Sequence, residues 1–241
     1  MNEITQAVRM MEGGQLKDLC ATVVQGVPTD LTFESADEAL SHKTELLAHV
    51  RSFYLFRSDL GDPLKDWERF YKKVFDLTVD LSGVKIPAKK AGFDRLVGVV
   101  PGITLNRVYD VSAKYYKCWR YTEDLDTAIP KHDRDPNKIG AYAIWIRGEE
   151  EPDVKLLNSS ANDLTGNQTK TVTIMEQKIF ELKYFLETKR HLDQKKVTLC
   201  AGSRDADGRV PRSGWSGGKS DWSWCRTGYR SERLGGREVV S

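Results

Sequence analysis

The sequence lacks most of the features that identify membrane, secreted or small metal-binding proteins. No segment approaches the ~20 apolar residues that a membrane-spanning helix requires, and the first residues, MNEITQAVRMMEGG, contain no apolar core of a signal peptide. Four widely separated cysteines (Cys20, Cys118, Cys200 and Cys225) form no CxxC pair, which argues against a zinc ribbon or a thioredoxin-like redox pair. We therefore expect a cytoplasmic protein with reduced thiols and no bound cofactor.

The sequence also lacks a strong excess of either charge. It has 37 Lys and Arg against 35 Asp and Glu, a net charge of +2 over 241 residues, so the whole chain exerts little attraction on an anionic partner. Residues 201–241 differ, because they contain eight Lys and Arg and only five Asp and Glu. The C-terminal part is therefore where an anionic partner would bind.

Residues 1–86 are predicted to form a helical region. Short helices are expected over 2–12 and 15–25, separated by Gly13-Gly14, and a longer one over 35–56. Asp62-Pro63 predicts the start of another helix, since Asp is a good N-cap and Pro at the first position loses no needed hydrogen bond. The expected buried stripe of that helix consists of Leu64, Trp67, Phe70, Tyr71 and Phe75.

Residues 87–241 are predicted to form an α+β region. Strands are expected at 93–100, 141–146 and 197–200, and Gly217-Gly218 predicts the turn of a C-terminal β-hairpin. Two helices, near 104–118 and 171–191, would cover one face of a small, mostly antiparallel sheet, and residues 148–170 would form a loop. In the second helix the apolar spacing predicts a buried stripe, and the charged residues Glu176, Lys178, Lys183 and Glu187 are expected in solvent.

The C-terminal half carries one recognisable pattern. The residues are Leu199-Cys200-Ala201-Gly202-Ser203-Arg204, then Asp207-Gly208, Val210-Pro211 and the final Arg237-Glu238-Val239-Val240-Ser241, together with 140–147 and the preceding Asp135-Pro136. Over residues 90–241 the chain resembles a group of uncharacterised bacterial proteins. That group has more aromatic residues after the Val-Pro than Arg212-Ser213-Gly214 here. The resemblance therefore says nothing about the activity or the ligand of this chain.

Three motifs match known sites only in part. Gly214-Trp215-Ser216-Gly217-Gly218 fits the G-x-S-x-G pattern of serine hydrolases, but every histidine precedes Ser216, so a turn explains the glycines better. Only three residues separate Cys200 from Arg204, too few for a phosphate-binding loop, so Cys200 is interpreted as a buried structural cysteine. Asp205-Ala206-Asp207-Gly208 lacks the final glutamate of a calcium loop and predicts an Asp-Gly turn.

Two clusters of polar residues suggest metal chemistry more directly. Glu38, His42, Glu45 and His49 would share one helical face, as zinc, iron or manganese ligands do, although a solvated face fits the same spacing. Acidic residues gather at 123–135, where a metal-dependent hydrolase or nuclease would place carboxylates. A metal-dependent enzyme is therefore the alternative interpretation, and no metal ligand is assigned.

The preferred hypothesis is a non-catalytic binding protein whose basic C-terminal region contacts single-stranded nucleic acid or another protein. Aromatic residues there alternate with cations, as on surfaces that stack bases and neutralise phosphates. Trp222 and Trp224 are two residues apart and are expected to face the core together, which leaves Trp215 for stacking. The predicted contact residues are Arg204, Arg209, Arg212, Trp215, Arg226 and Arg230. The oligomeric state is left open.

Overall fold

The computed structural model describes residues 62–241. The helices predicted within 1–56 and the face made by Glu38, His42, Glu45 and His49 lie outside the described residues. Within 62–241 no helix is long and apolar enough to cross a membrane.

The described chain contains helices and strands throughout, which confirms the α+β class. The helices are α5 (Pro63–Phe75), α6 (Leu105–Ser112), α7 (Leu125–Ala128), α8 (Pro136–Ile139), the 3₁₀ helix η1 (Val154–Leu156), α9 (Ala161–Gly166) and α10 (Ile174–Thr188). The strands are β1 (Arg95–Val99), β2 (Cys118–Arg120), β3 (Lys131–His132), β4 (Tyr142–Ile146), β5 (Val197–Leu199), β6 (Ser203–Arg204), β7 (Val210–Ser216), β8 (Lys219–Cys225) and β9 (Leu234–Gly236).

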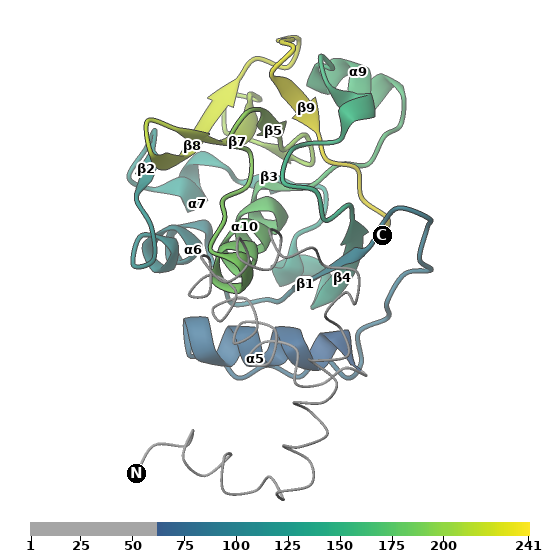
Figure 1. The fold of residues 1–241 in the computed structure, drawn as a ribbon, viewed down its shortest axis with the longest axis vertical. Coiled ribbons are helices and arrows are strands. Elements are labelled where there is room, and N and C mark those ends of the chain that lie inside the picture. Colours follow the sequence, from purple (N-terminus) through teal and green to yellow (C-terminus); the bar gives the residue numbers. More distant parts are fainter. Residues whose placement is uncertain (1–61) are drawn as a thin grey trace, which may run out of the picture. The chain divides into compact units, whose positions relative to one another are not determined.

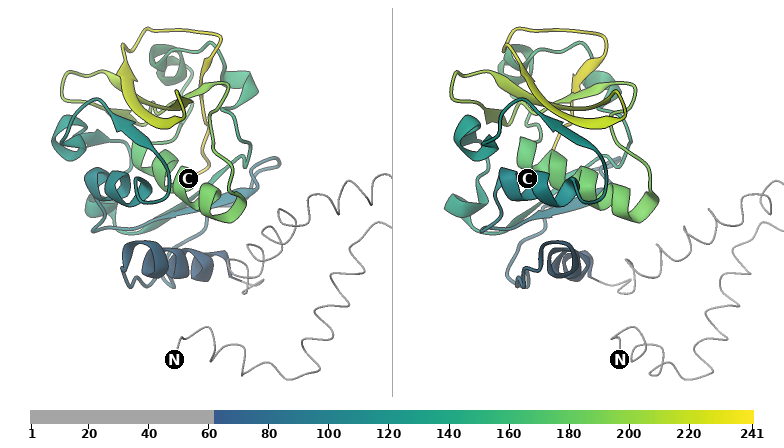
Figure 2. Two further views of the ribbon diagram at one scale, coloured as in Figure 1. Left: turned by 60° about the vertical axis from the view of Figure 1, so that its left-hand side comes forward. Right: turned by 90° about the vertical axis from the view of Figure 1, so that its left-hand side faces the viewer.

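Helix α10 lies at the centre of a layered arrangement (Figure 1). On one side is a five-stranded sheet of order β2-β8-β7-β5-β9, and on the other is the antiparallel pair β1–β4. Helix α6 lies beside α10, and α5 packs against β1 on the side away from α10 (Figures 1 and 2). Because strands flank α10 on two sides and α6 lies beside it, residues 174–183 of this helix are all buried.

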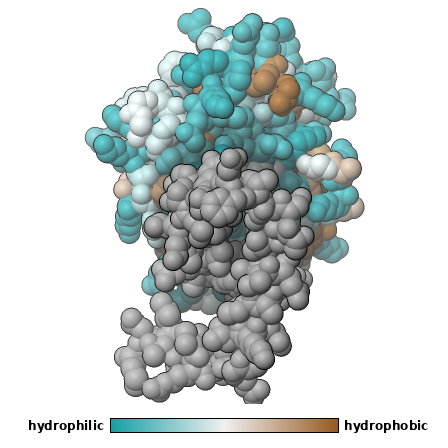
Figure 3. All heavy atoms as spheres, viewed as in Figure 1, coloured by the Kyte–Doolittle hydropathy of each residue, from teal (hydrophilic) through white to brown (hydrophobic). Residues whose placement is uncertain are grey.

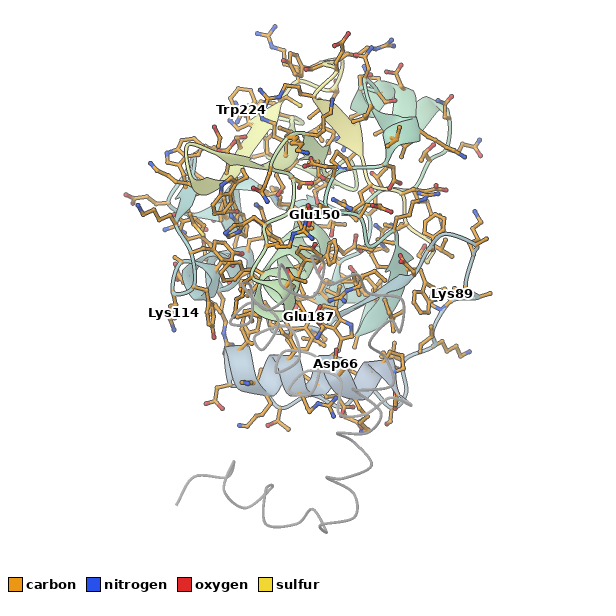
Figure 4. All side chains as sticks on the ribbon, in the orientation of Figure 1. Asp66, Lys89, Lys114, Glu150, Glu187 and Trp224 are labelled. Atoms are coloured by element: carbon orange, nitrogen blue, oxygen red, sulfur yellow. The ribbon has the colours of Figure 1, made fainter. Side chains whose placement is uncertain are left out.

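The position of α10 overturns the prediction that its charged residues are in solvent. Glu176, Lys178 and Lys183 are 1–2% exposed, and the Glu187 side chain is only 13% exposed. Each has an ion-pair partner: Arg134 for Glu176, Glu181 for Lys178, Asp66 for Lys183 and Arg95 for Glu187. Amphipathic spacing predicted the buried apolar stripe, but it does not show that a helix has a second layer on its polar face. Figure 4 shows Asp66 and Glu187 at this lower side of α10.

The five-stranded sheet is mixed. Its antiparallel pairs are β5–β7 and the hairpin β7–β8, and its parallel pairs are β2–β8 and β5–β9. The hairpin turns at Gly217 and Gly218, whose φ values of 57° and 73° are both left-handed, as a two-residue hairpin turn requires. The turn predicted from these two glycines is confirmed.

Helix α5 is anchored to β1 by side chains that the sequence pattern had predicted to be buried. Asp62 caps the helix by accepting from the Leu64 backbone N–H at 2.9 Å. Trp67 Nε1 donates to the Leu96 carbonyl at 3.1 Å, and the Tyr71 hydroxyl donates to the Gly98 carbonyl at 2.7 Å. These bonds satisfy the polar atoms of two large aromatic residues inside the core.

The segment 148–170, predicted as a loop, contains η1 and α9. Ser160 and Asp163 form a capping box at the start of α9, a signal that was present in the sequence. Ala161 and Leu164 pack with Leu199, Val210 and Cys225 in a second, smaller hydrophobic cluster on the sheet face away from α10. Helix α9 therefore covers one end of that face, and the other end, at β8 and β2, carries the polar residues described next.

Candidate binding surface

The β7–β8 hairpin separates a buried face from an exposed one. On the buried face Trp222 is 2% exposed and Ser220 is 0% exposed. Lys178 of α10 donates to the Ser220 hydroxyl at 3.0 Å and lies 4.8 Å from the centre of the Trp222 ring. The inward orientation predicted for Trp222 is confirmed.

Trp224 shares the Trp222 face but is only half-buried, because it lies near the end of β8 (Figure 4). The Arg209 guanidinium lies 3.7 Å from the centre of its ring. The same guanidinium forms ion pairs with Asp205 at 2.6 Å and Asp207 at 2.8 Å. The prediction that Trp224 faces fully inward is therefore met only in part. The Arg209 guanidinium covers part of the Trp224 ring that the core does not bury.

The opposite face of the hairpin carries a short chain of polar side chains. Arg212 on β7 lies opposite Ser223 on β8, and its Nε donates to the Ser223 hydroxyl at 2.8 Å. Ser223 in turn donates to Asp221 Oδ2 at 2.9 Å. Arg212 takes part in none of the ion pairs formed among residues 62–241. This relay, the chain of hydrogen bonds from Arg212 through Ser223 to Asp221, holds the Nε end of the guanidinium. The two terminal nitrogens of Arg212 remain available to a ligand.

Arg212 lines a hollow of about 730 Å³ together with the segment that follows β8: Trp224, Cys225, Arg226, Thr227, Gly228 and Tyr229. Arg226 is exposed, and its guanidinium has no hydrogen bond or ion pair to any other residue of the described part. Tyr229 is 48% exposed. None of these described lining residues is a carboxylate, so the hollow combines two cations with an accessible aromatic ring.

The six residues predicted as contacts do not form one surface. Arg212 and Arg226 meet at the hollow, and Arg230 follows Tyr229 in the chain but forms an ion pair with Asp163 at 2.5 Å. Arg204 donates to the carbonyls of Ala201 and Ser203 at 2.6 and 2.7 Å. Arg209 is held by Asp205, Asp207 and the Trp224 ring. Arg204 and Arg209 therefore have structural roles.

Trp215 lies at the other end of β7, away from Arg212. Its ring stacks on His191 at 3.5 Å between centroids, with 22° between the planes, and Tyr116 approaches its edge. Burial lowers the pKa of His191, so a neutral imidazole is the form favoured there. One face of Trp215 is therefore already covered by a ring of the protein itself.

Three carboxylates of the acidic segment 123–135 accept hydrogen bonds at the starts of helices. Asp124 accepts from the backbone of Asp126 and Thr127, and Asp135 accepts from Asn137. Asp126 accepts from the Leu105 backbone N–H at 2.6 Å, at the start of α6. No cluster of three metal-ligating side chains occurs in residues 62–241.

One serine–histidine pair occurs where β3 and β6 meet. His132 Nδ1 lies 2.8 Å from the Ser203 hydroxyl, which also accepts from the Ile174 backbone N–H at 3.0 Å. Ser203 is 1% exposed, and burial lowers the pKa of His132. A nucleophile must reach its substrate, and this hydroxyl instead fixes the start of α10.

Fold and surface together define an α+β protein with a basic, aromatic hollow beside a β-hairpin. Compared with protein-family models, curated proteins and solved structures, the chain gives no match. The assignment of function therefore rests on this surface alone.

Two exposed aromatic residues near this surface were not among the predicted contacts. Tyr229 could have been identified, because it lies between Arg226 and Arg230. Trp119, which is 46% exposed, gave no signal, because its place beside the hairpin depends on a strand pairing between positions 102 residues apart, Trp119 and Asp221.

Proposed function

We propose that this protein binds single-stranded nucleic acid, without chemically altering it, through the hollow lined by Arg212, Arg226 and Tyr229. A phosphate is attracted to both guanidinium groups, and an unpaired base has a ring on which to stack. The cytoplasmic location expected from the sequence would place it with RNA and with transiently unpaired DNA.

The observation that carries the proposal is the state of the two arginines. Where an arginine of residues 201–241 already faces a carboxylate, as Arg209 and Arg230 do, a phosphate would have to displace that carboxylate. Within 62–241 neither Arg212 nor Arg226 forms an ion pair with a carboxylate, and none of the described residues that line the hollow is acidic. Their charge is available to a ligand without such a cost.

A fixed arginine also favours binding. The Ser223 and Asp221 relay orients Arg212, so less side-chain freedom is lost when a ligand binds. Gly228 adds no side chain to the hollow, and a Cβ built there would meet only the side-chain amide of Asn162, at 3.6 Å. The hollow thus remains open to a backbone phosphate.

The proposal is tested with fluorescein-labelled DNA and RNA oligonucleotides of about ten nucleotides, titrated at about 50 mM salt, where electrostatic attraction is strong. Tyr229→Ala should weaken binding by about 1–3 kcal/mol if the ring stacks on a base. The double variant Arg212→Ala/Arg226→Ala should weaken it further.

Lys114→Ala/Lys155→Ala is the matched control, because both lysines are exposed, lie away from the hollow and have no ion-pair partner within 62–241. It removes the same charge and should bind nearly as the wild type does. Equal weakening in the two double variants would show that binding depends on net charge and would reject the hollow as the site.

A further inference from the structure

The exposed sheet face continues from Arg212 across β8 to the edge strand β2. Trp119 of β2 lies directly opposite Asp221 of β8, and Asp221 lies opposite Gly214 of β7. Side chains of directly paired residues share a sheet face, so Trp119, Asp221, Ser223 and Arg212 all stand on the face away from α10. Figure 1 shows the three strands side by side.

Asp221 is the acceptor at the middle of this face. Its Oδ2 accepts from Ser223, and its Oδ1 has no hydrogen bond to any residue of 62–241. It is half-buried, with Trp119 on one side and the side-chain-free Gly214 on the other. The carboxylate therefore has an open oxygen beside an exposed aromatic ring.

This pair fits one kind of nucleobase better than the others. A base stacked on Trp119 would turn an edge toward Asp221, and a carboxylate can only accept hydrogen bonds. Guanine presents two adjacent donors, N1–H and the N2 amino group, on its Watson–Crick edge. Adenine and cytosine each present a single amino group, and uracil a single N–H between two carbonyl oxygens, which a carboxylate repels.

We propose that Trp119 and Asp221 form a subsite for a guanine base. The same bound strand of nucleic acid would place a phosphate in the neighbouring hollow. The inference rests on the proposed function and adds a base preference to it. Arg212 stands two strands away from Trp119, about 10 Å at the usual strand spacing. One bound strand can therefore place a phosphate at Arg212 and a base on Trp119.

The test compares oligonucleotides that contain guanine, inosine or adenine at one position in an otherwise uridine strand. Inosine lacks only the N2 amino group. The wild type should bind the guanine strand at least about fivefold more tightly than the inosine strand, within the range for a bidentate base contact. Asp221→Asn should abolish this preference, so that the variant binds the guanine and inosine strands with equal affinity.

Trp119→Ala should weaken binding of the guanine strand at least about fivefold, the lower end expected for a stacked base. Tyr115→Ala is the control, because Tyr115 is similarly exposed, at 43%, but follows α6 and is not part of the sheet. Equal wild-type affinity for guanine and inosine, or an unchanged preference in Asp221→Asn, overturns the subsite. If binding still depends on Arg212 and Arg226, the proposed function survives that result; if no oligonucleotide binds, both are rejected.

Discussion

At the scale of single side chains, a charged residue is available to a ligand only when no other group of the protein already binds it. Arg237 is 0% exposed and donates to Asp193 at 3.1 Å and to the Glu149 carbonyl at 2.8 Å, so it serves the core. Arg226, only eleven positions earlier, has no such partner in the described chain. Two arginines of the same basic segment thus belong to different classes, and sequence composition does not separate them.

The buried Asp193 gives a testable pH dependence. Burial raises its pKa from 3.8 to about 6, although the nearby Arg237 acts in the opposite direction. Between these two values the folded protein holds a proton that the unfolded chain has lost. The stability contributed by this group is therefore full below pH 3.8 and is lost as pH rises through about 6.

Urea unfolding of the wild type and Asp193→Asn between about pH 4 and 7.5 measures this contribution. The free energy of unfolding of the wild type minus that of the variant should fall up to about pH 6 and then stay level. A difference that rises with pH would show that the ionised form is the stabilising one.

Among the elements, α10 depends most on charges that sit inside the protein. Glu176 pairs with Arg134 at 2.7 Å, and their side chains are 0% and 11% exposed. Glu176→Ala would leave the Arg134 guanidinium buried without its counter-ion, and we expect the free energy of unfolding to fall by about 3–5 kcal/mol. Urea denaturation measures it.

The surface pair Lys72–Asp76 is the comparison, since it has a similar separation of 2.7 Å but side chains that are 60% and 89% exposed. Lys72→Ala should cost no more than about 1 kcal/mol. If both variants are destabilised by a similar amount, burial is not what makes the α10 pair important.

Several elements follow from local sequence signals. The Asp62-Pro63 start of α5, the Thr104 cap of α6 and the Gly217-Gly218 turn were predictable because each depends on residues within one turn. The burial of Lys178 was not, because it is caused by strands that lie some 40 positions later in the chain. The parallel pairing that brings Trp119 beside Asp221 is likewise a long-range event.

The candidate site was predictable to the same extent. Sequence composition located the basic, aromatic segment and included Arg212 and Arg226. It could not show that Arg204, Arg209 and Arg230 are engaged by neighbouring carbonyls and carboxylates, nor that Trp215 already stacks on His191. Each of these facts depends on the tertiary partner.

In the described molecule as a whole, the buried charged groups lie around α10, and the candidate binding surface lies on the outer face of the five-stranded sheet. Ion pairs join α10 to β1 and to α5, and the Lys178–Ser220 hydrogen bond joins it to the five-stranded sheet. The outer sheet face is covered by α9 at one end only. The side of the surface seen in Figure 3 is largely hydrophilic outside the grey residues. The hollow at Arg212 is therefore built on a sheet that packs directly on the core, an arrangement that favours a binding role.

The salt dependence of binding tests this account most directly. Removing one phosphate-binding cation from a single-stranded complex should reduce the slope of log affinity against log salt by about 0.7. Arg212→Ala/Arg226→Ala should therefore flatten that slope by about 1.4, while Lys114→Ala/Lys155→Ala leaves it unchanged. Parallel lines for the wild type and the arginine double variant, or no binding of any single strand at about 50 mM salt, would contradict phosphate binding at the hollow.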